Sequence, residues 1–253
     1  MNPLLRLTNV TKRFGGLIAV NDVSFSADEG CITGIIGPNG AGKTTLFNLV
    51  TGNYAPDGGD ILFRGVSLPG RKPHEIVDLG VARTFQSIRL FSSLSVLENA
   101  LAGRHCRMRA GLLASMFGTA AQRREERAAV ERAVQELEFT GLAEFLNDKA
   151  GSLSYGNRRL LEIARALASD PVLIALDEPA GSMNQPETEV LVRLIRAVRD
   201  RGITVMLIEH DMGLVMQVCE KLIVLEYGIK IAEGSPAEIR DNPRVVEAYL
   251  GQD

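Results

Sequence analysis

The sequence predicts an α/β protein with a mostly parallel sheet, an N-terminal antiparallel β subdomain and a helical insertion. Three observations predict this class. Short apolar segments such as CITGIIG and VLIALD alternate with helical patterns, as in parallel sheets that are covered on both faces. The opening segments LLRLTNVTKRFGG and LIAVNDVSFSADEG alternate apolar and polar residues around a Gly-Gly turn, which indicates antiparallel strands. From Phe91 to about Gly151, strand patterns give way to helical ones.

In the first half of the chain, the elements follow from the spacing of apolar residues and glycines. CITGIIG predicts a buried strand, KTTLFNLVTG a helix closed by Gly52, and GGDILFRGVSL a further strand. In the insertion, Val130, Ala133 or Val134, and Leu137 recur at helical spacing. We interpret the charged run RREER beside them as a solvated helix face.

After Leu153, helices and strands alternate regularly. The pattern predicts three helices, at 158–168, about 187–200 and 212–219, each followed by a strand: VLIALD, ITVMLIEH and KLIVLEYG, respectively. The sequence therefore predicts a single domain, 1–253, with an α/β core formed by 1–86 and 158–253 and a helical subdomain formed by 87–157.

The composition limits the classes of function and location. The net charge of −3 gives no electrostatic reason to expect nucleic acid as a partner. Cys31, Cys106 and Cys219 lie far apart without a C-x-x-C pair, which indicates neither a metal site nor a disulfide framework and suits a reducing cytosol. The N-terminus lacks the pattern of a signal peptide, and no apolar run approaches the roughly 18 residues of a membrane span.

A glycine-rich segment between a predicted strand and a predicted helix indicates a phosphate site. GPNGAGKTT fulfils G-x-x-x-x-G-K-[ST], a P-loop whose backbone N–H groups and helix N-terminus cradle phosphates. We expect Lys43 to reach the β- and γ-phosphates of a nucleotide and the Thr44 hydroxyl to ligate Mg²⁺. The residues predicted to bind the nucleotide here are Gly37, Pro38, Asn39, Gly40, Ala41, Gly42, Lys43, Thr44 and Thr45.

Polar residues end two of the predicted strands, at the sheet edge where open α/β sheets bind ligands. After VLIALD, Asp177 is predicted to hold Mg²⁺ and Glu178 to act as the general base, or orienter, for an attacking water. The alternative is that these acids cap the next helix. After ITVMLIE, His210 is predicted to hydrogen-bond the γ-phosphate and the attacking water, and the alternative is a structural histidine.

Two further residues are candidates for the same site. Gln86 closes a predicted strand just before the helical insertion, where its amide can contact Mg²⁺ or position water. Phe14 stands at a strand end, where its ring can stack on adenine, and the alternative is a phenylalanine of the core.

The order and spacing of these motifs, together with LSYGNRR, resemble the ATP-binding subunits of ABC transporters over essentially the whole chain. The resemblance implies an ATPase in which Phe14 stacks on adenine, Gln86 senses metal and water, and His210 contacts the γ-phosphate. It also implies that two subunits, identical or paralogous, pair head to tail. Ser154 and Gly156 would then contact the partner subunit's ATP from a helix N-terminus.

The segment LSYGNRR also raises a question of charge. Arg158 and Arg159 stand in the first turn of a helix, where positive charge opposes the helix dipole unless an anion lies nearby. The resemblance implies that this anion is a partner's ATP, and the alternative is that the arginines point sideways to solvent or to acidic partners. The sequence departs from the family pattern at three positions: Tyr155 stands for the usual Gly, Asn157 for the usual Gln and Asn184 for the usual Asp.

Finer features resemble the ATP-binding subunits of branched-chain (hydrophobic) amino-acid importers, namely ARTFQSIRLFSSLSVLENAL, LDEPAGSMNQPE and EGSPAEIRDNPRVVEAYLG. This resemblance implies integral membrane permease subunits as partners, a periplasmic solute-binding protein as an indirect partner, and a peripheral position at the cytoplasmic face of the inner membrane. The alternatives are another transport system (urea, other amino acids or lipopolysaccharide export) and a non-transport ABC ATPase. A GTPase or simple kinase is disfavoured, because N-K-x-D is absent and LSYGNRR would be unexplained.

The contact with membrane subunits is expected in the insertion. RMRAGLLASMFG, Arg107 to Gly118, is basic and then apolar, and it is too short to span a bilayer. Leu90 and Phe91 are predicted to belong to the same docking surface. The alternative for both segments is packing within the protein.

Overall fold

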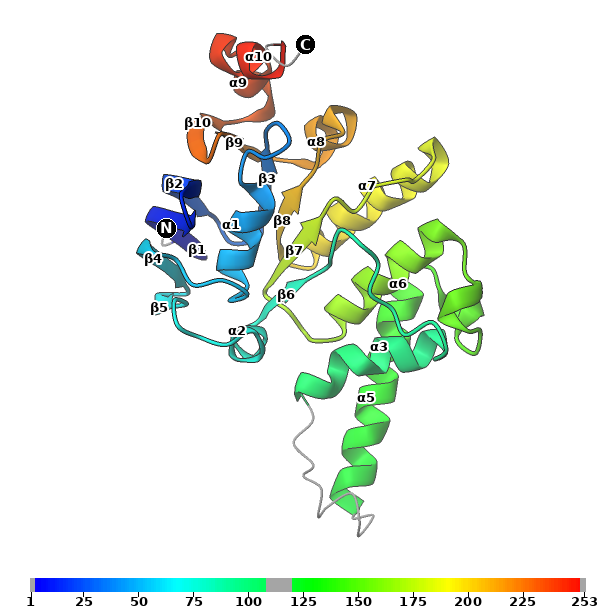
Figure 1. Cartoon of the computed structure of the whole chain (residues 1–253). Helices are drawn as coiled ribbons and strands as arrows, with labels where there is room; N and C mark the ends of the chain where they lie inside the picture. Colours follow the sequence, from blue (N-terminus) through cyan, green and yellow to red (C-terminus); the bar gives the residue numbers. More distant parts are fainter. Residues whose placement is uncertain (1–2, 108–119, 251–253) are drawn as a thin grey trace. The chain divides into compact units, whose positions relative to one another are not determined.

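Figure 1 shows the computed structural model of the chain, which describes residues 3–107 and 120–250. The chain divides into two units, Met1–Arg83 with Val172–Asp253, and Thr84–Pro171. The second unit reaches further along the chain than the insertion expected at 87–157. The reason is that α6 (Tyr155–Leu167), which the sequence assigns mostly to the core, packs against two other helices of the second unit.

The first unit contains a sheet of six strands: β3 (Ile32–Ile36), β6 (Val81–Arg83), β7 (Leu173–Asp177), β8 (Thr204–Ile208), β9 (Lys221–Glu226) and β10 (Ile229–Gly234). Their order is β10-β9-β3-β8-β7-β6, and all neighbours pair in parallel except β10, which is antiparallel to β9. Every residue of β3, β7 and β8 is buried, because both faces of the parallel sheet are covered. The expected mostly parallel sheet is confirmed.

A second sheet of the first unit is antiparallel. It consists of β1 (Leu5–Phe14), β2 (Leu17–Ala27), β4 (Gly58–Phe63) and β5 (Val66–Ser67), in the order β2-β1-β4-β5. β1 and β2 form a hairpin whose paired residues run from Leu5 with Ala27 to Phe14 with Leu17. The N-terminal antiparallel subdomain predicted from alternation is therefore confirmed.

The helices of the first unit are α1 (Lys43–Val50), α2 (Pro73–Leu79), α7 (Gln185–Asp200), α8 (Met212–Val218), α9 (Pro236–Arg240) and α10 (Pro243–Leu250). One hydrophobic cluster contains residues of both sheets and of α1, whose Leu46 and Phe47 are fully buried. Helix α7 begins at Gln185, earlier than expected, because the Asn184 side chain accepts a hydrogen bond from Glu187 N at 3.0 Å. Asn184 therefore caps this helix in the place of the usual Asp.

Among the described residues of the second unit, the regular elements are helices, and one isolated bridge joins Ser95 and Lys149. Its helices are α3 (Val96–Arg104), α5 (Ala120–Phe139), α6, and the short 3₁₀ turns η1 (His105–Arg107), η2 (Ala143–Phe145) and η3 (Ala150–Ser152). On α5, Ala133 and Leu137 are fully buried, but Val130 is 38% exposed and does not belong to the core as the spacing suggested.

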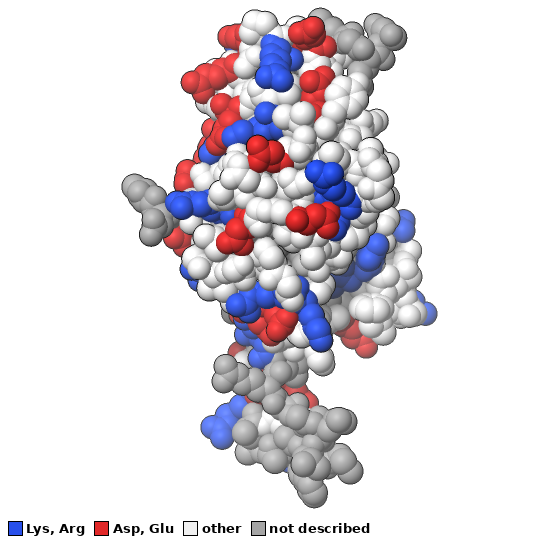
Figure 2. Space-filling view, turned by 60° about the vertical axis from the view of Figure 1, so that its left-hand side comes forward, with Lys and Arg blue, Asp and Glu red and all other residues white. Residues whose placement is uncertain are grey.

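Two sequence expectations concern the surface. RMRAGLLASMFG lies outside the described residues beyond Arg107, so its docking role stays a prediction. Within the described part of the chain, no helix is long and apolar enough to cross a membrane. Figure 2 shows basic and acidic side chains interspersed on the face that it presents.

Candidate functional site

The turn between β3 and α1 is built on glycines that no other residue could replace without strain. Gly37, Gly40 and Gly42 have positive φ values of 143°, 78° and 98°. A Cβ at Gly37 would lie 2.0 Å from Leu225 O, and one at Gly42 would lie 2.4 Å from Ala19 O. Glycine thus permits both the left-handed backbone of this turn and its close contact with neighbouring backbone. The loop that results leads into the N-terminus of α1, a combination suited to phosphate.

Lys43 begins α1 and is held across this turn. Its Nζ donates to Gly37 O at 2.6 Å and to Pro38 O at 2.9 Å, and only 7% of the residue is exposed. Burial lowers the pKa of Lys43, while the carboxylates of Glu178 and Asp177 oppose that shift. The structure therefore brings the P-loop lysine within electrostatic reach of the two acids that end β7.

Asp177 is the last residue of β7 and is 1% exposed. Its Oδ2 accepts a hydrogen bond at 2.7 Å from the guanidinium of Arg83, the last residue of β6. The same guanidinium donates to Asn48 Oδ1 at 2.6 Å and Thr51 Oγ1 at 3.1 Å, and it lies 5.6 Å from the Phe47 ring centroid. Arg83 therefore joins the acid at the strand end to the helix that begins with Lys43.

Glu178 and His210 lie at neighbouring strand ends. Glu178 has the left-handed φ of +46°, which is uncommon for a residue with a side chain, and its amide donates to Ile208 O at 2.9 Å. His210 is exposed, and its Nδ1 lies 3.9 Å from Glu178 Oε2 and 3.8 Å from Glu209 Oε2. The strained backbone and the nearby imidazole fit a functional carboxylate better than a simple helix cap.

The buried Glu209 organises this edge and was not predicted. Its Oε1 accepts from Ala180 N at 2.8 Å and its Oε2 from His210 N at 3.0 Å, and it is 1% exposed. One carboxylate thus holds the loop after Glu178 and the residue His210 together.

As for Glu209, no role was predicted for Arg83 from the sequence. The only signal for either residue is a charged side chain next to a strand that is otherwise apolar.

The first unit offers oxygen ligands that fit Mg²⁺. Thr44 is exposed at the start of α1, and Asp177 supplies a carboxylate at the end of β7. No group of three or more His, Cys, Asp or Glu residues that could hold a metal occurs in the part of the chain that the structure describes. A hydroxyl and one carboxylate suit a metal that keeps several waters and takes its other ligands from substrate phosphates.

Phe14 lies at the end of β1 with 42% of its surface exposed, so its interpretation as a core residue is wrong. Its ring meets Tyr54 edge to face, with centroids 5.1 Å apart, and Lys12 Nζ lies 5.5 Å from its centroid. Stacking on adenine stays a prediction that this exposure permits.

The remaining predicted residues belong to the second unit. Ser154 is exposed and caps α6, because its Oγ accepts from Asn157 N at 3.2 Å, while the hydroxyl proton remains able to donate. Gly156 is buried in the first turn of the same helix, and Gln86 is exposed in the irregular segment after β6. Their contacts with nucleotide or metal stay predictions.

The anion beside Arg159 is not a partner's phosphate but Glu162 of its own helix. Arg159 is 2% exposed, and its Nη1 lies 3.0 Å from Glu162 Oε2. Arg158 is half-buried, and its Nε donates to Leu153 O at 3.1 Å. The implied contact with a partner's ATP is therefore wrong for Arg159, because burial in its own unit leaves the guanidinium turned inward.

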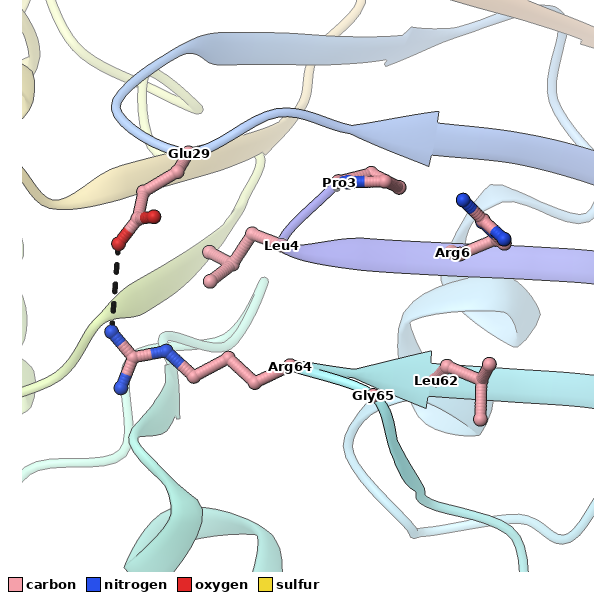
Figure 3. A pocket seen from close by; sticks show the side chains of 7 residues that line it. All are labelled: Pro3, Leu4, Arg6, Glu29, Leu62, Arg64 and Gly65. Atoms are coloured by element: carbon pink, nitrogen blue, oxygen red, sulfur yellow. Dashed lines mark hydrogen bonds and ion pairs between the residues drawn. The ribbon is translucent and has the colours of Figure 1, made fainter. Parts of the chain in front are cut away.

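A cavity of about 360 Å³ lies elsewhere in the first unit, beside β1 and β4 (Figure 3). Its lining contains none of the predicted site residues: it consists of Pro3, Leu4, Arg6, Glu29, Leu62, Arg64 and Gly65. The one ion pair drawn in Figure 3 joins Glu29 and Arg64 at 3.5 Å, and both side chains are more than half exposed. Nothing in these contacts resembles the phosphate turn.

Comparison with known proteins gives matches over nearly the whole chain. The family described as "ABC transporter" matches residues 20–181, and that described as "Branched-chain amino acid ATP-binding cassette transporter" matches residues 230–253. The chain is 47% identical over 251 residues to the high-affinity branched-chain amino acid transport ATP-binding protein BraF of Pseudomonas aeruginosa. It is 45% identical over 251 residues to the corresponding LivG protein of Escherichia coli. Both alignments cover 99% of this chain and 98% of the relative.

Solved structures give the same result. The ADP conformation of MJ1267, an ATP-binding cassette of an ABC transporter, matches with a TM-score of 0.87 and 36% identity and covers 100% of both chains. The dimeric structure of MJ0796, a bacterial ABC transporter cassette, matches with a TM-score of 0.77 and 26% identity. That match covers 92% of this chain and 98% of the other.

Proposed function

The chain belongs to the ATP-binding cassette family of ABC transporters and is an ABC ATPase, and from this premise we propose that it drives the import of branched-chain amino acids. The observation that carries the substrate class is the match of residues 230–253 to a family described by branched-chain amino acid transport. The near-half identity to BraF and LivG along the whole chain supports it.

We propose that ATP binds with its phosphates on the turn Gly37–Gly42. The Lys43 ammonium, now bound by two carbonyls of the turn, would turn to the β- and γ-phosphates. The negative phosphates would offset the effect of burial on this lysine, so that it stays charged when nucleotide is bound. Thr45 follows in the same helical turn, and Phe14 would stack on the adenine from the end of β1.

Hydrolysis in this proposal depends on Glu178 and His210. The Glu178 carboxylate would accept a proton from the attacking water, and His210, 3.9 Å away, would hydrogen-bond the γ-phosphate. Mg²⁺ would be held by Thr44 and Asp177, with Gln86 as a further ligand, and when bound it would neutralise phosphate charge. Glu209 would hold the residues after β7 and β8 in place, because its carboxylate accepts hydrogen bonds from Ala180 N and His210 N.

A second subunit, identical or paralogous, would complete each site. Ser154 and the Gly156 amide would face the partner's γ-phosphate from the N-terminus of α6, where anions are favoured. The dimeric structure of the similar cassette MJ0796 supports the pairing of two subunits. The other proposed partners are integral membrane permease subunits and, indirectly, a periplasmic solute-binding protein, with this chain peripheral at the cytoplasmic face of the inner membrane.

The test is ATP-dependent uptake into proteoliposomes that contain the chain and the membrane subunits that co-purify with it. We expect uptake of leucine, isoleucine and valine but not of urea. Lys43→Ala is the matched control and should abolish both uptake and ATP hydrolysis, because few other cations balance the phosphate charge. Uptake of urea in place of leucine would overturn the substrate class, and undiminished hydrolysis by Lys43→Ala would overturn the site.

A further inference from the structure

The segment Phe85–Arg89 has no regular secondary structure, and side chains of α6 bind its backbone. Arg159 Nη1 donates to Phe85 O at 2.6 Å, and Nη2 donates to Gln86 O. Glu162 Oε1 accepts from Phe85 N and from Arg89 N, each at 3.4 Å. Two side chains of one helix thus bind both carbonyls and amides of the segment that carries Gln86.

These two side chains form a buried ion pair. Arg159 and Glu162 expose 3% and 1% of their side chains, and they stand three residues apart on α6. Arg165 adds a third charge, because one of its Nη atoms lies 3.9 Å from Glu162 Oε1 and the other donates to Arg89 O. Burial raises the pKa of Glu162, and Arg159 opposes that rise. Displacing either side chain would leave the other charge buried without its partner, which is costly, so the pair opposes movement of the segment relative to α6.

Tyr155 extends these contacts to the beginning of α6. Its hydroxyl accepts from Arg159 Nη2 at 3.3 Å, and the guanidinium carbon lies 5.7 Å from its ring centroid. Tyr155 directly follows the cap residue Ser154 and stands where the family usually has glycine, which could make neither contact. A continuous set of contacts therefore leads from the N-terminus of α6 to the backbone of Gln86.

We propose that Arg159 and Glu162 are positioning residues that make Gln86 and the N-terminus of α6 move as one body. The inference rests on the proposed function, in which Gln86 serves its own subunit's site and Ser154 meets the partner's ATP. A partner's phosphate that displaces α6 then displaces Gln86 too. Occupancy of one ATP site is thereby transmitted to the catalytic geometry of the other.

The direct test is hydrogen–deuterium exchange at the amides of Phe85 and Arg89. In the double variant Arg159→Met and Glu162→Met, both buried charges are removed together, which avoids the unpaired charge that could prevent folding of a single variant. We expect these two amides to exchange at least about tenfold faster than in the parent protein. Arg104→Met is the matched control, because it breaks an arginine pair with Asp170 in the same unit without touching Phe85–Arg89. Unchanged protection in the double variant would overturn the proposal.

The functional test is a double-mutant cycle in ATP hydrolysis with Gln86→Ala. The Arg159/Glu162 double variant should lower kcat about tenfold with little change in KM for ATP, since misplacing one catalytic group costs turnover more than binding. In the Gln86→Ala background, the same double variant should lower kcat no further. An equal additional loss there would mean that the pair acts by general stability, and it would overturn the link to Gln86.

The two readouts separate failure of this inference from failure of the proposed function. If Gln86→Ala leaves kcat unchanged, the proposed role of Gln86 is wrong and the transmission falls with it, whereas the exchange data still decide whether α6 fixes the segment. Tyr155→Phe keeps the ring and loses the hydroxyl, so it should produce a smaller change in exchange than the double variant. Exchange in Tyr155→Phe as fast as in the double variant would contradict the central place given to the buried ion pair.

Discussion

Arg83 links the acid at the end of β7 to the helix that begins with Lys43. Its guanidinium contacts a carboxylate at the end of β7, two side chains of α1 and the face of Phe47. Only 7% of its side chain is exposed, so these contacts replace water almost completely. A buried guanidinium with three polar partners fixes the distance between the helix that begins with Lys43 and the acid at Asp177.

Arg83→Met should therefore lower the stability of the folded chain. The Asp177 carboxylate would lose its guanidinium partner in a buried place, and we expect the free energy of unfolding without nucleotide to fall by about 3 kcal/mol. Mg²⁺ with ADP should recover part of this loss, because a divalent cation supplies positive charge beside the carboxylate. Urea denaturation with and without Mg²⁺ and ADP measures both effects.

The exposed pair of Arg64 and Glu29 supplies the control for that experiment. Its side chains are 52% and 64% exposed, so Arg64→Met should change the free energy of unfolding by less than about 1 kcal/mol. Equal losses in the two variants would show that the burial of Arg83 is not what makes its ion pair important.

Cys219 should be chemically inert in the native protein. Burial, with Glu220 and Glu209 nearby, raises its pKa to about 12, so at pH 8 only about one thiol in ten thousand is a thiolate. Iodoacetamide should modify the half-buried Cys31 before Cys219 in the folded chain, and both at similar rates in urea, as peptide mass mapping can show. Because the folded state holds this proton more tightly than the unfolded state, its contribution to stability is present below pH 9 and lost as the pH rises toward about 12. Equal modification of both cysteines in the folded chain would be the contrary result.

At the scale of elements, the irregular segment after β6 is fixed by two helices. Helix α6 binds its beginning through Arg159 and Glu162, and α3 binds its end through Asn99. Phe91 N donates to Asn99 Oδ1 at 2.9 Å, and Asn99 Nδ2 donates to Phe91 O at 3.1 Å. The Phe91 side chain is 55% exposed, so a fixed backbone presents an apolar ring to solvent. The ring is therefore not packed within the protein, and its place in a docking surface stays a prediction.

Phe91→Asp should uncouple transport from ATP hydrolysis. The substitution replaces an apolar ring, which we expect to contact a permease subunit, with a carboxylate. The hydrogen bonds between the backbone of residue 91 and Asn99 remain. We expect loss of leucine uptake in proteoliposomes, with basal ATP hydrolysis and melting temperature close to those of the parent chain. A large fall in melting temperature would instead mean that Phe91 stabilises the folded chain, and the docking assignment would fail.

At the scale of the whole molecule, the proposed ATP sites are incomplete in a single chain. Glu178→Gln keeps the shape of the side chain but removes the base, so closed dimers should accumulate with ATP and Mg²⁺ and not with ADP. Ser154→Arg in that background should abolish the dimer and spare nucleotide binding, because the larger cation fills the space of the partner's phosphate. Size-exclusion chromatography with light scattering measures the dimer.

If the natural partner is a paralogous cassette, the homodimer is expected to be weak, so the variant is also mixed with any second cassette that co-purifies with the parent chain. Glu178→Gln that stays monomeric with ATP and Mg²⁺ in both experiments would contradict a shared site. A dimer that persists after Ser154→Arg would remove Ser154 from the interface.

The sequence by itself determined the features that consecutive residues encode. The glycine spacing of GPNGAGKTT dictates the left-handed turn before Lys43, and apolar segments that end in acids place Asp177 and Glu178 at a sheet edge. Caps are local as well, yet α6 and α7 begin earlier than expected, at Tyr155 and Gln185, because Ser154 and Asn184 accept backbone hydrogen bonds. Local steric and hydrogen-bonding rules suffice for such features.

Only the tertiary structure decided which groups the long buried side chains meet. Arg83 finds Asp177 across 94 residues of sequence, and Arg159 finds the carbonyl of Phe85 across 74. An arginine in a sequence is compatible with solvent, a phosphate or a carboxylate, and its choice depends on the desolvation cost and the partners at its final position. The same dependence on packing made Phe14 exposed, turned Arg159 inward and joined α6 to the second unit. Burial is a property of the assembled chain, and it determined the partners of charged side chains that the sequence alone left open.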